Sequence, residues 1–278
     1  MKKLLLLSFI FISTILQAQI INIGEVTMLK GTARGGYFHA VFAPDGTFIV
    51  TSQENYNGLM RHDIETGKRQ KLSSAQSAGY GAVFSEDSKS IYYNNAETKD
   101  AIRYNSLERV NTKNSEKVKL SAAARYRISP ARYIKSLYIT IEDEGMLLHK
   151  NGTTTLLAPI GEESYYWTSI SPDQQHILFS TAYHGTCVCE INGDNVVRLG
   201  RLNAPKWMGN DCVIGMQEKD DEQGRITSSK LVVMTIDGKK SQTLNLKENI
   251  AMYPAASIDG KRIAFNNAKG QIYLIEVK

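Results

Sequence analysis

The stretch Phe42-Ala43-Pro44-Asp45-Gly46 returns in altered form along the 278-residue sequence. Three copies are clear and two are degenerate, and together they occupy Phe84–Ser88, Ile128–Pro130, Ile170–Gln174, Trp207–Asp211 and Ala256–Gly260. Successive copies lie about 43 residues apart, and the residues between them follow strand rather than helix periodicity. A repeat of this length, built on tight turns between short apolar runs, predicts the blades of a β-propeller.

Each repeat can be read as four strands separated by Gly, Asp or Asn turns. In the first repeat we expect an inner strand at Tyr37–Phe42, a second at Thr47–Gln53, a third at Gly58–Ile64 and an outer strand at Arg69–Leu72. Later repeats keep this order. The sequence therefore predicts an all-β, six-bladed β-propeller.

The last repeat stops after its third strand, Gln271–Val277, and lacks an outer strand. A spare strand stands near the start of the chain, because Glu25–Lys30 resembles the outer strands of other repeats. We expect Glu25–Lys30 to complete the last blade and so to close the ring, which would remove an open sheet edge.

The first 18 residues have the pattern of a signal peptide: two lysines, an apolar run, and Ala18 at the expected cleavage site. Residues 19–278 would then form a single propeller domain, with no membrane span after signal cleavage, in the periplasm or outside the cell. The formal net charge of +5 is mild, and no run of Lys and Arg occurs. Nucleic acid is therefore not expected as a partner.

Three cysteines follow the leader: Cys187, Cys189 and Cys212. Cys187 and Cys189 would share one face of a strand and are too close in sequence to pair easily. We expect all three to be small buried apolar residues, although Cys212 could pair with either of the others in an exported protein. Two insertions also stand out, a polar turn over 105–116 and a charged hairpin tip over 218–225.

The turn signature resembles the TolB-like (WD40-like) propeller repeats. The resemblance is carried by Ala43-Pro44-Asp45-Gly46, Ser171-Pro172-Asp173-Gln174 and Ser257-Ile258-Asp259-Gly260, with Arg262–Phe265 as a following strand. It extends from about residue 20 to the end of the chain. It implies a six-bladed propeller and, for exported members, a periplasmic interaction module. The same repeats also occur in peptidases and in some pectin-fragment lyases.

The sequence offers little sign of catalysis. A Gly-x-Ser-x-Gly pentapeptide, a phosphate-binding loop and a dinucleotide motif are all absent from it. The five histidines do not occupy equivalent strand positions, so no metal site and no cofactor are expected; they are His39, His62, His149, His176 and His184.

Aromatic and basic residues recur where the inner strands begin, and these positions should crowd one mouth of the central channel. The candidate ligand-binding residues are His39, Tyr80, Arg125, Arg127, Tyr166, Trp167, Lys206 and Tyr253. Such a surface suits a peptide, a terminal carboxylate or an acidic glycan. The same aromatics could instead pack only between neighbouring blades.

The favoured function is thus a non-catalytic binding module that presents one channel face to a protein or cell-envelope partner. The alternative is a carbohydrate-active enzyme similar to the oligouronide lyases. It would use His39 and Tyr80 or Tyr253 for acid–base chemistry and Arg125 to stabilise charge.

Overall fold

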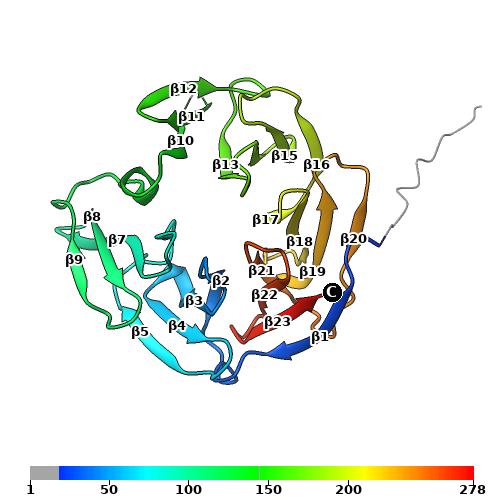
Figure 1. Cartoon of the computed structure of the whole chain (residues 1–278), viewed down its shortest axis with the longest axis horizontal. Coiled ribbons are helices and arrows are strands. Elements are labelled where there is room, and N and C mark those ends of the chain that lie inside the picture. Colours follow the sequence, from blue (N-terminus) through cyan, green and yellow to red (C-terminus); the bar gives the residue numbers. More distant parts are fainter. Residues whose placement is uncertain (1–18, 144) are drawn as a thin grey trace, which may run out of the picture.

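The computed structural model describes residues 19–143 and 145–278, which form a ring of antiparallel sheets (Figure 1). The described residues make six sheets, which we number as blades 1 to 6 from the first anchor repeat. The predicted six-bladed β-propeller is confirmed. The predicted signal peptide, residues 1–18, lies outside the described residues.

Five blades have four strands each, and the third has three. The strands of blades 1 to 3 are β2 (Phe38–Phe42), β3 (Phe48–Ser52), β4 (Leu59–Asp63) and β5 (Arg69–Ser73); β6 (Val83–Phe84), β7 (Ser90–Lys99), β8 (Ile102–Asn111) and β9 (Lys117–Lys119); and β10 (Leu137–Glu142), β11 (Gly145–Lys150) and β12 (Thr153–Leu157). The strands of blades 4 to 6 are β13 (Tyr165–Ile170), β14 (His176–Thr181), β15 (Gly185–Glu190) and β16 (Val197–Gly200); β17 (Asn203–Met208), β18 (Cys212–Asp220), β19 (Ile226–Thr235) and β20 (Ser241–Thr243); and β21 (Met252–Ala256), β22 (Arg262–Asn266), β23 (Ile272–Val277) and β1 (Ile23–Met28).

The repeated turn is held by the same hydrogen bonds in several blades. The anchor serine hydroxyl donates to the aspartate two residues later, at 2.7 Å for Ser85–Asp87 and at 2.5 Å for Ser171–Asp173 and Ser257–Asp259. Each aspartate also accepts a backbone N–H two residues further on. These bonds lower the pKa of the three carboxyls, the serine bond being the largest cause. The recurring Ser-x-Asp pattern is therefore a self-capping turn.

The ring closes as the sequence predicts. Strand β1 pairs antiparallel with β23, with Val26 opposite Ile275 and Met28 opposite Tyr273. Beyond the strand, the Leu29 N–H donates to the Ile272 carbonyl at 2.8 Å. Residues 23–28 thus supply the outer strand that blade 6 lacks, and they join the two ends of the described chain.

Apolar clusters fill the spaces between most neighbouring blades. Five such clusters lie among the described residues, at the boundaries 1–2, 3–4, 4–5, 5–6 and 6–1. Their largest fully buried side chains include Tyr93, Phe179 and Phe265. Within the described part of the chain, no apolar cluster of this kind lies between blades 2 and 3.

The three cysteines pack among apolar side chains between the blades, as expected. Cys187 and Cys189 are buried in the cluster between blades 3 and 4, and Cys212 is half-buried at the boundary of blades 5 and 6. All three thiols are free. Burial raises the pKa of Cys187 to about 11 and that of Cys189 to about 12, so both are poor nucleophiles.

Blade 3 departs from the prediction, because the inner strand expected from its repeat does not form. The segment Arg125–Ser129, called the strap below, lies against blade 2 instead. The Asn94 side-chain amide donates to the Ile128 carbonyl at 2.8 Å, and its oxygen accepts the Ile128 N–H at 3.1 Å. The strap leads into a short 3-10 helix, η2 (Pro130–Tyr133). Asn94 thereby takes the backbone hydrogen bonds that a neighbouring strand would have taken.

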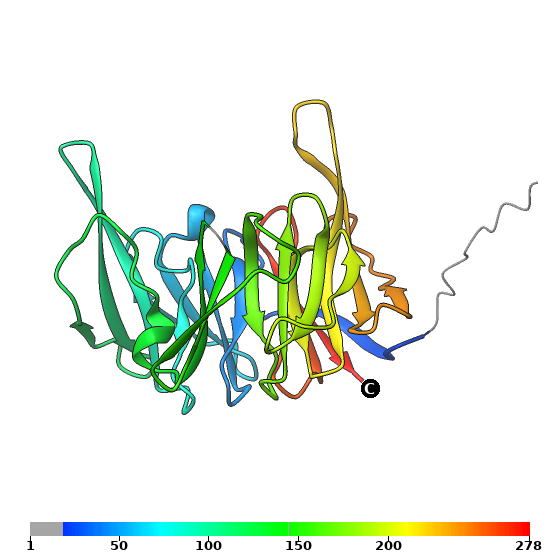
Figure 2. The same cartoon turned by 90° about the horizontal axis from the view of Figure 1, so that it is seen from above.

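Two long hairpins rise from one face of the ring (Figure 2). One is β7–β8, in which pairing continues to Lys99 opposite Ile102, so the polar turn expected over 105–116 is wrong. Leu107 and Val110 on β8 are fully buried, and their burial explains why the strand continues there. The other hairpin is β18–β19, whose charged tip was expected. Within the described residues, no helix is long and apolar enough to span a bilayer.

Thr32 ties the closing strand in place and offers a test of ring closure. It is fully buried; its hydroxyl donates to the Leu29 carbonyl at 2.8 Å and accepts the Ile272 N–H at 3.2 Å. Thr32→Val keeps the volume but leaves a buried N–H without a partner, so the free energy of unfolding should fall by about 1–3 kcal/mol. Urea unfolding measures this, and Thr32→Ser, which keeps the hydroxyl, should lose less. Equal losses in the two variants would contradict the role given to the hydroxyl.

Candidate functional site

The inner strands share a β-bulge near their first residue. In β2, β13, β17 and β21 two residues stand opposite one residue of the next strand, as His39 and Ala40 do opposite Thr51. The first residue within each bulge has a positive φ, and blade 2 has Gly81 at the matching position; the angles are 54° for His39, 68° for Gly81, 51° for Trp167, 48° for Ala204 and 49° for Tyr253. A bulge turns a side chain away from the regular alternation of a strand.

This backbone conformation is costly for large side chains. Glycine adopts it freely, but a bulky residue there costs on the order of 1–3 kcal/mol. His39, Trp167 and Tyr253 nevertheless occupy it. Strain of this kind persists only where the surrounding structure imposes it, and it is concentrated at binding and active sites. The bulges therefore mark the start of the inner strands as a candidate site.

Four aromatic side chains from three blades meet near the starts of the inner strands. We call them the mouth cluster: His39, Tyr56, Tyr80 and Tyr253. His39 stacks on Tyr56, with ring centroids 3.8 Å apart, and lies 4.4 Å from Tyr253. Tyr56 in turn meets Tyr80 edge to face at 5.2 Å. Tyr56 comes from η1 (Glu54–Tyr56), the turn between β3 and β4. The His39–Tyr56 contact lies within blade 1, and the Tyr56–Tyr80 contact joins consecutive blades, whereas the His39–Tyr253 contact joins blades 1 and 6 and therefore depends on ring closure.

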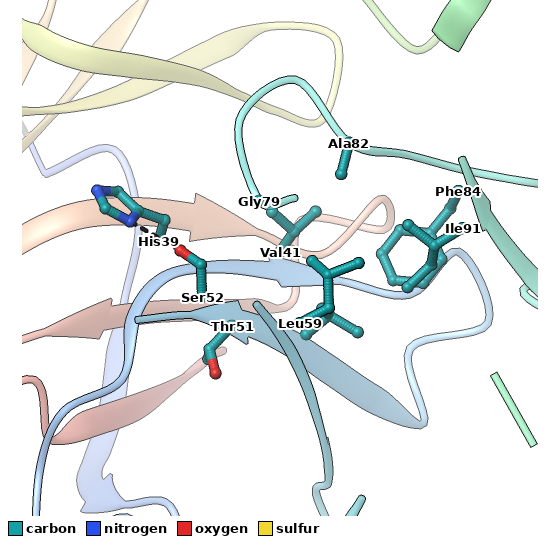
Figure 3. Close-up of a pocket in the computed structure, with 10 residues that line it drawn as sticks. His39, Val41, Thr51, Ser52, Leu59, Gly79, Ala82, Phe84 and Ile91 are labelled. Atoms are coloured by element: carbon teal, nitrogen blue, oxygen red, sulfur yellow. Dashed lines mark hydrogen bonds between the residues drawn. The ribbon is translucent and has the colours of Figure 1, made fainter. Parts of the chain in front are cut away.

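His39 is the centre of the cluster and is held from two sides. Figure 3 shows Ser52 turned toward the imidazole, and a 3.0 Å hydrogen bond joins Ser52 Oγ to His39 Nδ1. The backbone N–H of His39 donates to the side-chain oxygen of Asn266, in blade 6, at 3.4 Å. Burial, and secondarily the charge of Lys206, lower the pKa of His39 to about 4. The imidazole is therefore neutral at pH 7.

Basic groups border the cluster. The Arg127 guanidinium lies 4.5 Å from the centre of the Tyr80 ring, and its Nη2 donates to the Tyr80 carbonyl at 2.6 Å. Lys206 on β17 is solvent-accessible, yet enough protein surrounds it that desolvation lowers its pKa. The side chain is thus hydrated and at the same time closely surrounded by protein.

One carboxyl faces the same region. Burial, and secondarily Asp220, raise the pKa of Glu218 on β18. Its side chain accepts a hydrogen bond from the Asn203 amide, while its second oxygen is buried without a partner. Burial raises the pKa of Tyr253, and the charge of Glu218 adds to the shift. The site thus combines a neutral imidazole, phenols, an amine and a carboxyl.

The remaining predicted residues lie apart from the mouth cluster. Tyr166 and Trp167 form their own edge-to-face pair at 5.0 Å, on β13 across the ring from β2 (Figure 1). They are 36% and 40% exposed, so they do not act only as packing between blades. Arg125 lies exposed on the strap, because blade 3 has no inner strand to direct it inward.

A groove of about 400 Å³ runs beside the mouth cluster. Phe38, His39, Met252 and Tyr253 form one side of it, and Ile226 at the end of the blade 5 hairpin forms another. The long hairpin therefore extends the wall of the site. An elongated ligand could lie along this groove with one end at the aromatic rings.

Two members of the site, Tyr56 and Glu218, were not predicted. The repeat pattern indicates only the starts of inner strands, whereas Tyr56 lies in a strand-connecting turn and Glu218 in the charged hairpin of blade 5. A tyrosine inside the polar stretch Gln53–Gly58 was the available signal. Across residues 19–143 and 145–278, no three His, Cys, Asp or Glu side chains come together in a way that could hold a metal ion.

Solved structures match this chain in shape. TolB from Acinetobacter baumannii superposes with a TM-score of 0.56 at 16% identity, over 79% of this chain and 56% of that one. A putative TolB from Agrobacterium tumefaciens gives 0.53 at 14% identity, over 87% of this chain and 90% of that one. The tricorn protease gives 0.53 at 14% identity, over 88% of this chain and 26% of that one.

No protein-family model matches the sequence, and no curated protein sequence does. The chain has the TolB-like six-bladed propeller fold that its repeats predicted. At these identities the likeness concerns the fold alone, and one propeller fold hosts many functions.

The pKa of His39 gives a direct test of the site geometry. In the folded protein the His39 resonance should titrate near pH 4, against about 6.5 in urea-unfolded protein. Since the unfolded chain then binds more protons between these values, stability should fall as the pH drops from 6.5 to 4. NMR titration and urea unfolding at several pH values measure both effects. His62, whose pKa is also about 4, contributes to the same loss, so the comparison is made with His39→Gln. A folded-state midpoint near 6.5 would contradict the buried imidazole.

Proposed function

We propose that this protein is an exported binding module that receives part of a protein or cell-envelope partner at the mouth cluster. Residues 1–18 would act as its signal peptide, and residues 19–278 would fold as one propeller in the periplasm or outside the cell. The observation that carries the proposal is the set of bulged inner strands. Where these strands begin, they hold the bulky side chains His39, Trp167 and Tyr253 in a strained backbone conformation. Strain of this kind clusters at binding and active sites, which supports a binding role for these side chains.

The surface is suited to a peptide segment. Tyr80 and Trp167 leave much of their rings accessible, and large rigid aromatics supply contact area at a low cost in conformational entropy. Lys206 and Arg127 can pair with a carboxylate, while Glu218 accepts hydrogen bonds from backbone or amine groups.

A lyase acting on acidic oligosaccharides is the second candidate. It is favoured by the shifted pKa values of His39, Lys206 and Tyr253 at one place, because such shifts gather at catalytic sites. Arg125, which this reading needs beside the substrate, lies on the strap away from the mouth cluster. We therefore propose binding without catalysis as the function.

Fluorescence can test the binding proposal. The chain has two tryptophans, so Trp207→Phe leaves a single reporter, Trp167, which lies on β13 across the ring from the mouth cluster. We expect six-residue peptides with a free terminal carboxylate to change its emission. In this background Tyr253→Ala and Lys206→Met should each weaken binding roughly tenfold, because each removes a ring or a charge from the site.

Two controls keep the outcomes apart. Lys113→Met, a matched change on the exposed rim of blade 2, should leave peptide binding unchanged. Trigalacturonate is tested in parallel, with the ultraviolet absorbance of an unsaturated product as the readout. Product formation would favour the lyase and contradict a non-catalytic role; peptide binding that is indifferent to Tyr253 and Lys206 would contradict the site.

A further inference from the structure

Blade 3 has an empty place where the other blades have an inner strand. Its sheet order is β10-β11-β12, so β10 is paired on one side only. The anchor turn of this repeat precedes β10, as the corresponding turns precede the second strands β3 and β14. β10 therefore holds the second-strand position. The chain that should lie inside it is the strap, which is hydrogen-bonded to blade 2 instead.

A cavity lies beside the vacant strand position, against one face of the blade 3 sheet. A space of about 720 Å³ lies between the strap with η2 on one side and one face of the blade 3 sheet on the other. The opposite face of that sheet packs on blade 4 through Leu137, Ile139 and Met146. The cavity thus replaces the apolar cluster that fills the other boundaries, and alternate side chains of a strand added at β10 would point into it.

The free edge of β10 lacks the usual protection against pairing. Its sequence, Leu-Tyr-Ile-Thr-Ile-Glu over 137–142, contains no lysine, proline or glycine, and its register with β11 shows no bulge. Edge strands that must stay single carry such residues or bulges. β-branched and aromatic side chains instead favour the addition of another strand.

The lining of the cavity favours an acidic occupant. Arg127, Arg132 and Lys135 contribute three positive charges, against one carboxylate from Glu142. The sheet face itself is polar and rigid. His149 stacks on Tyr138 at 4.4 Å, and its two ring nitrogens are hydrogen-bonded to threonine hydroxyls of β10 and β12 at 2.8 and 3.0 Å.

We propose that an extended, acidic segment of a partner protein adds to β10 and supplies the fourth strand of blade 3. Backbone hydrogen bonds to β10 provide the affinity, and the three cations select acidic side chains. The edge of a folded sheet, including that of a second copy, is disfavoured by position: β10 is the strand of its blade nearest the ring centre (Figure 1), a position that suits a single extended chain better than the edge of a folded sheet.

This inference goes beyond the proposed function, because the cavity shares only Arg127 with the groups that border the mouth cluster. A protein could bind a strand here whether or not the mouth cluster binds peptides. Tyr253→Ala, which disables the mouth cluster, should therefore leave strand addition intact.

The test uses the full propeller and three synthetic seven-residue peptides: one alternating valine or threonine with aspartate, one with lysine in place of aspartate, and an acidic one N-methylated at alternate residues. We expect the acidic peptide alone to slow hydrogen exchange of the Leu137–Glu142 amides. The double variant Arg132→Glu/Lys135→Glu should weaken its binding roughly tenfold or more. Both residues are exposed, so the variant should fold, as a thermal melt checks.

Lys119→Glu, a matched charge reversal on the exposed outer strand of blade 2, should bind the acidic peptide normally. Slowed exchange with the acidic peptide that the N-methylated peptide does not reproduce supports strand addition. Three outcomes overturn the proposal: no slowing with any peptide; equal slowing with the N-methylated peptide; or slow exchange at β10 in the protein alone, which would place the strap there.

Discussion

The pairing of β1 with β23 is the contact on which the rest of this structure depends. Each blade is a small sheet with two faces, and each face needs a neighbour to bury it. An open row of six sheets would leave one face bare at either end and an unpaired strand on the last blade. Closure removes both problems with one short strand. The hydroxyl of Thr32 stabilises this junction, because it accepts a hydrogen bond from the backbone N–H of Ile272 at the start of β23.

Closure also determines where chemistry can occur. It brings blade 6 beside blade 1, so Tyr253 meets His39 although the two are far apart in sequence, and Tyr56 connects them to Tyr80 of blade 2. Crowding there removes water from ionisable groups. It explains why burial is the first cause of the pKa shifts of His39, Tyr253, Lys206 and Glu218. The bulges add a second constraint, since they hold large side chains where a strand would normally turn them away.

Blade 3 shows how far the repeat can be broken without opening the ring. The sheet face of blade 3 that lies toward blade 4 still packs on that blade. Toward blade 2 the connection is made by the strap, which is hydrogen-bonded to Asn94 of blade 2. What is lost is the apolar contact between blades 2 and 3. A polar cavity with an unguarded strand edge replaces it, so the least regular blade offers the most open surface for a partner.

The sequence by itself determined the architecture. The Ser-Pro-Asp-Gly type turns are local structures that a few residues specify through their own hydrogen bonds. The spacing of these turns along the chain predicted the number of blades. The spare strand at Glu25–Lys30 was visible because strand patterns are local as well. The inner-strand positions His39, Tyr80, Lys206 and Tyr253 followed from the same repeat.

Only the tertiary structure decided which of these residues meet. Tyr56 and Glu218 joined the site from turns and hairpins whose direction depends on packing between blades, and Arg125 left it because its strand did not form. The fate of the strap was set by competition: the Asn94 amide in blade 2 and the open edge of β10 both offer backbone hydrogen bonds to it. Which partner wins depends on contacts between blades, and a single repeat of the sequence does not contain them.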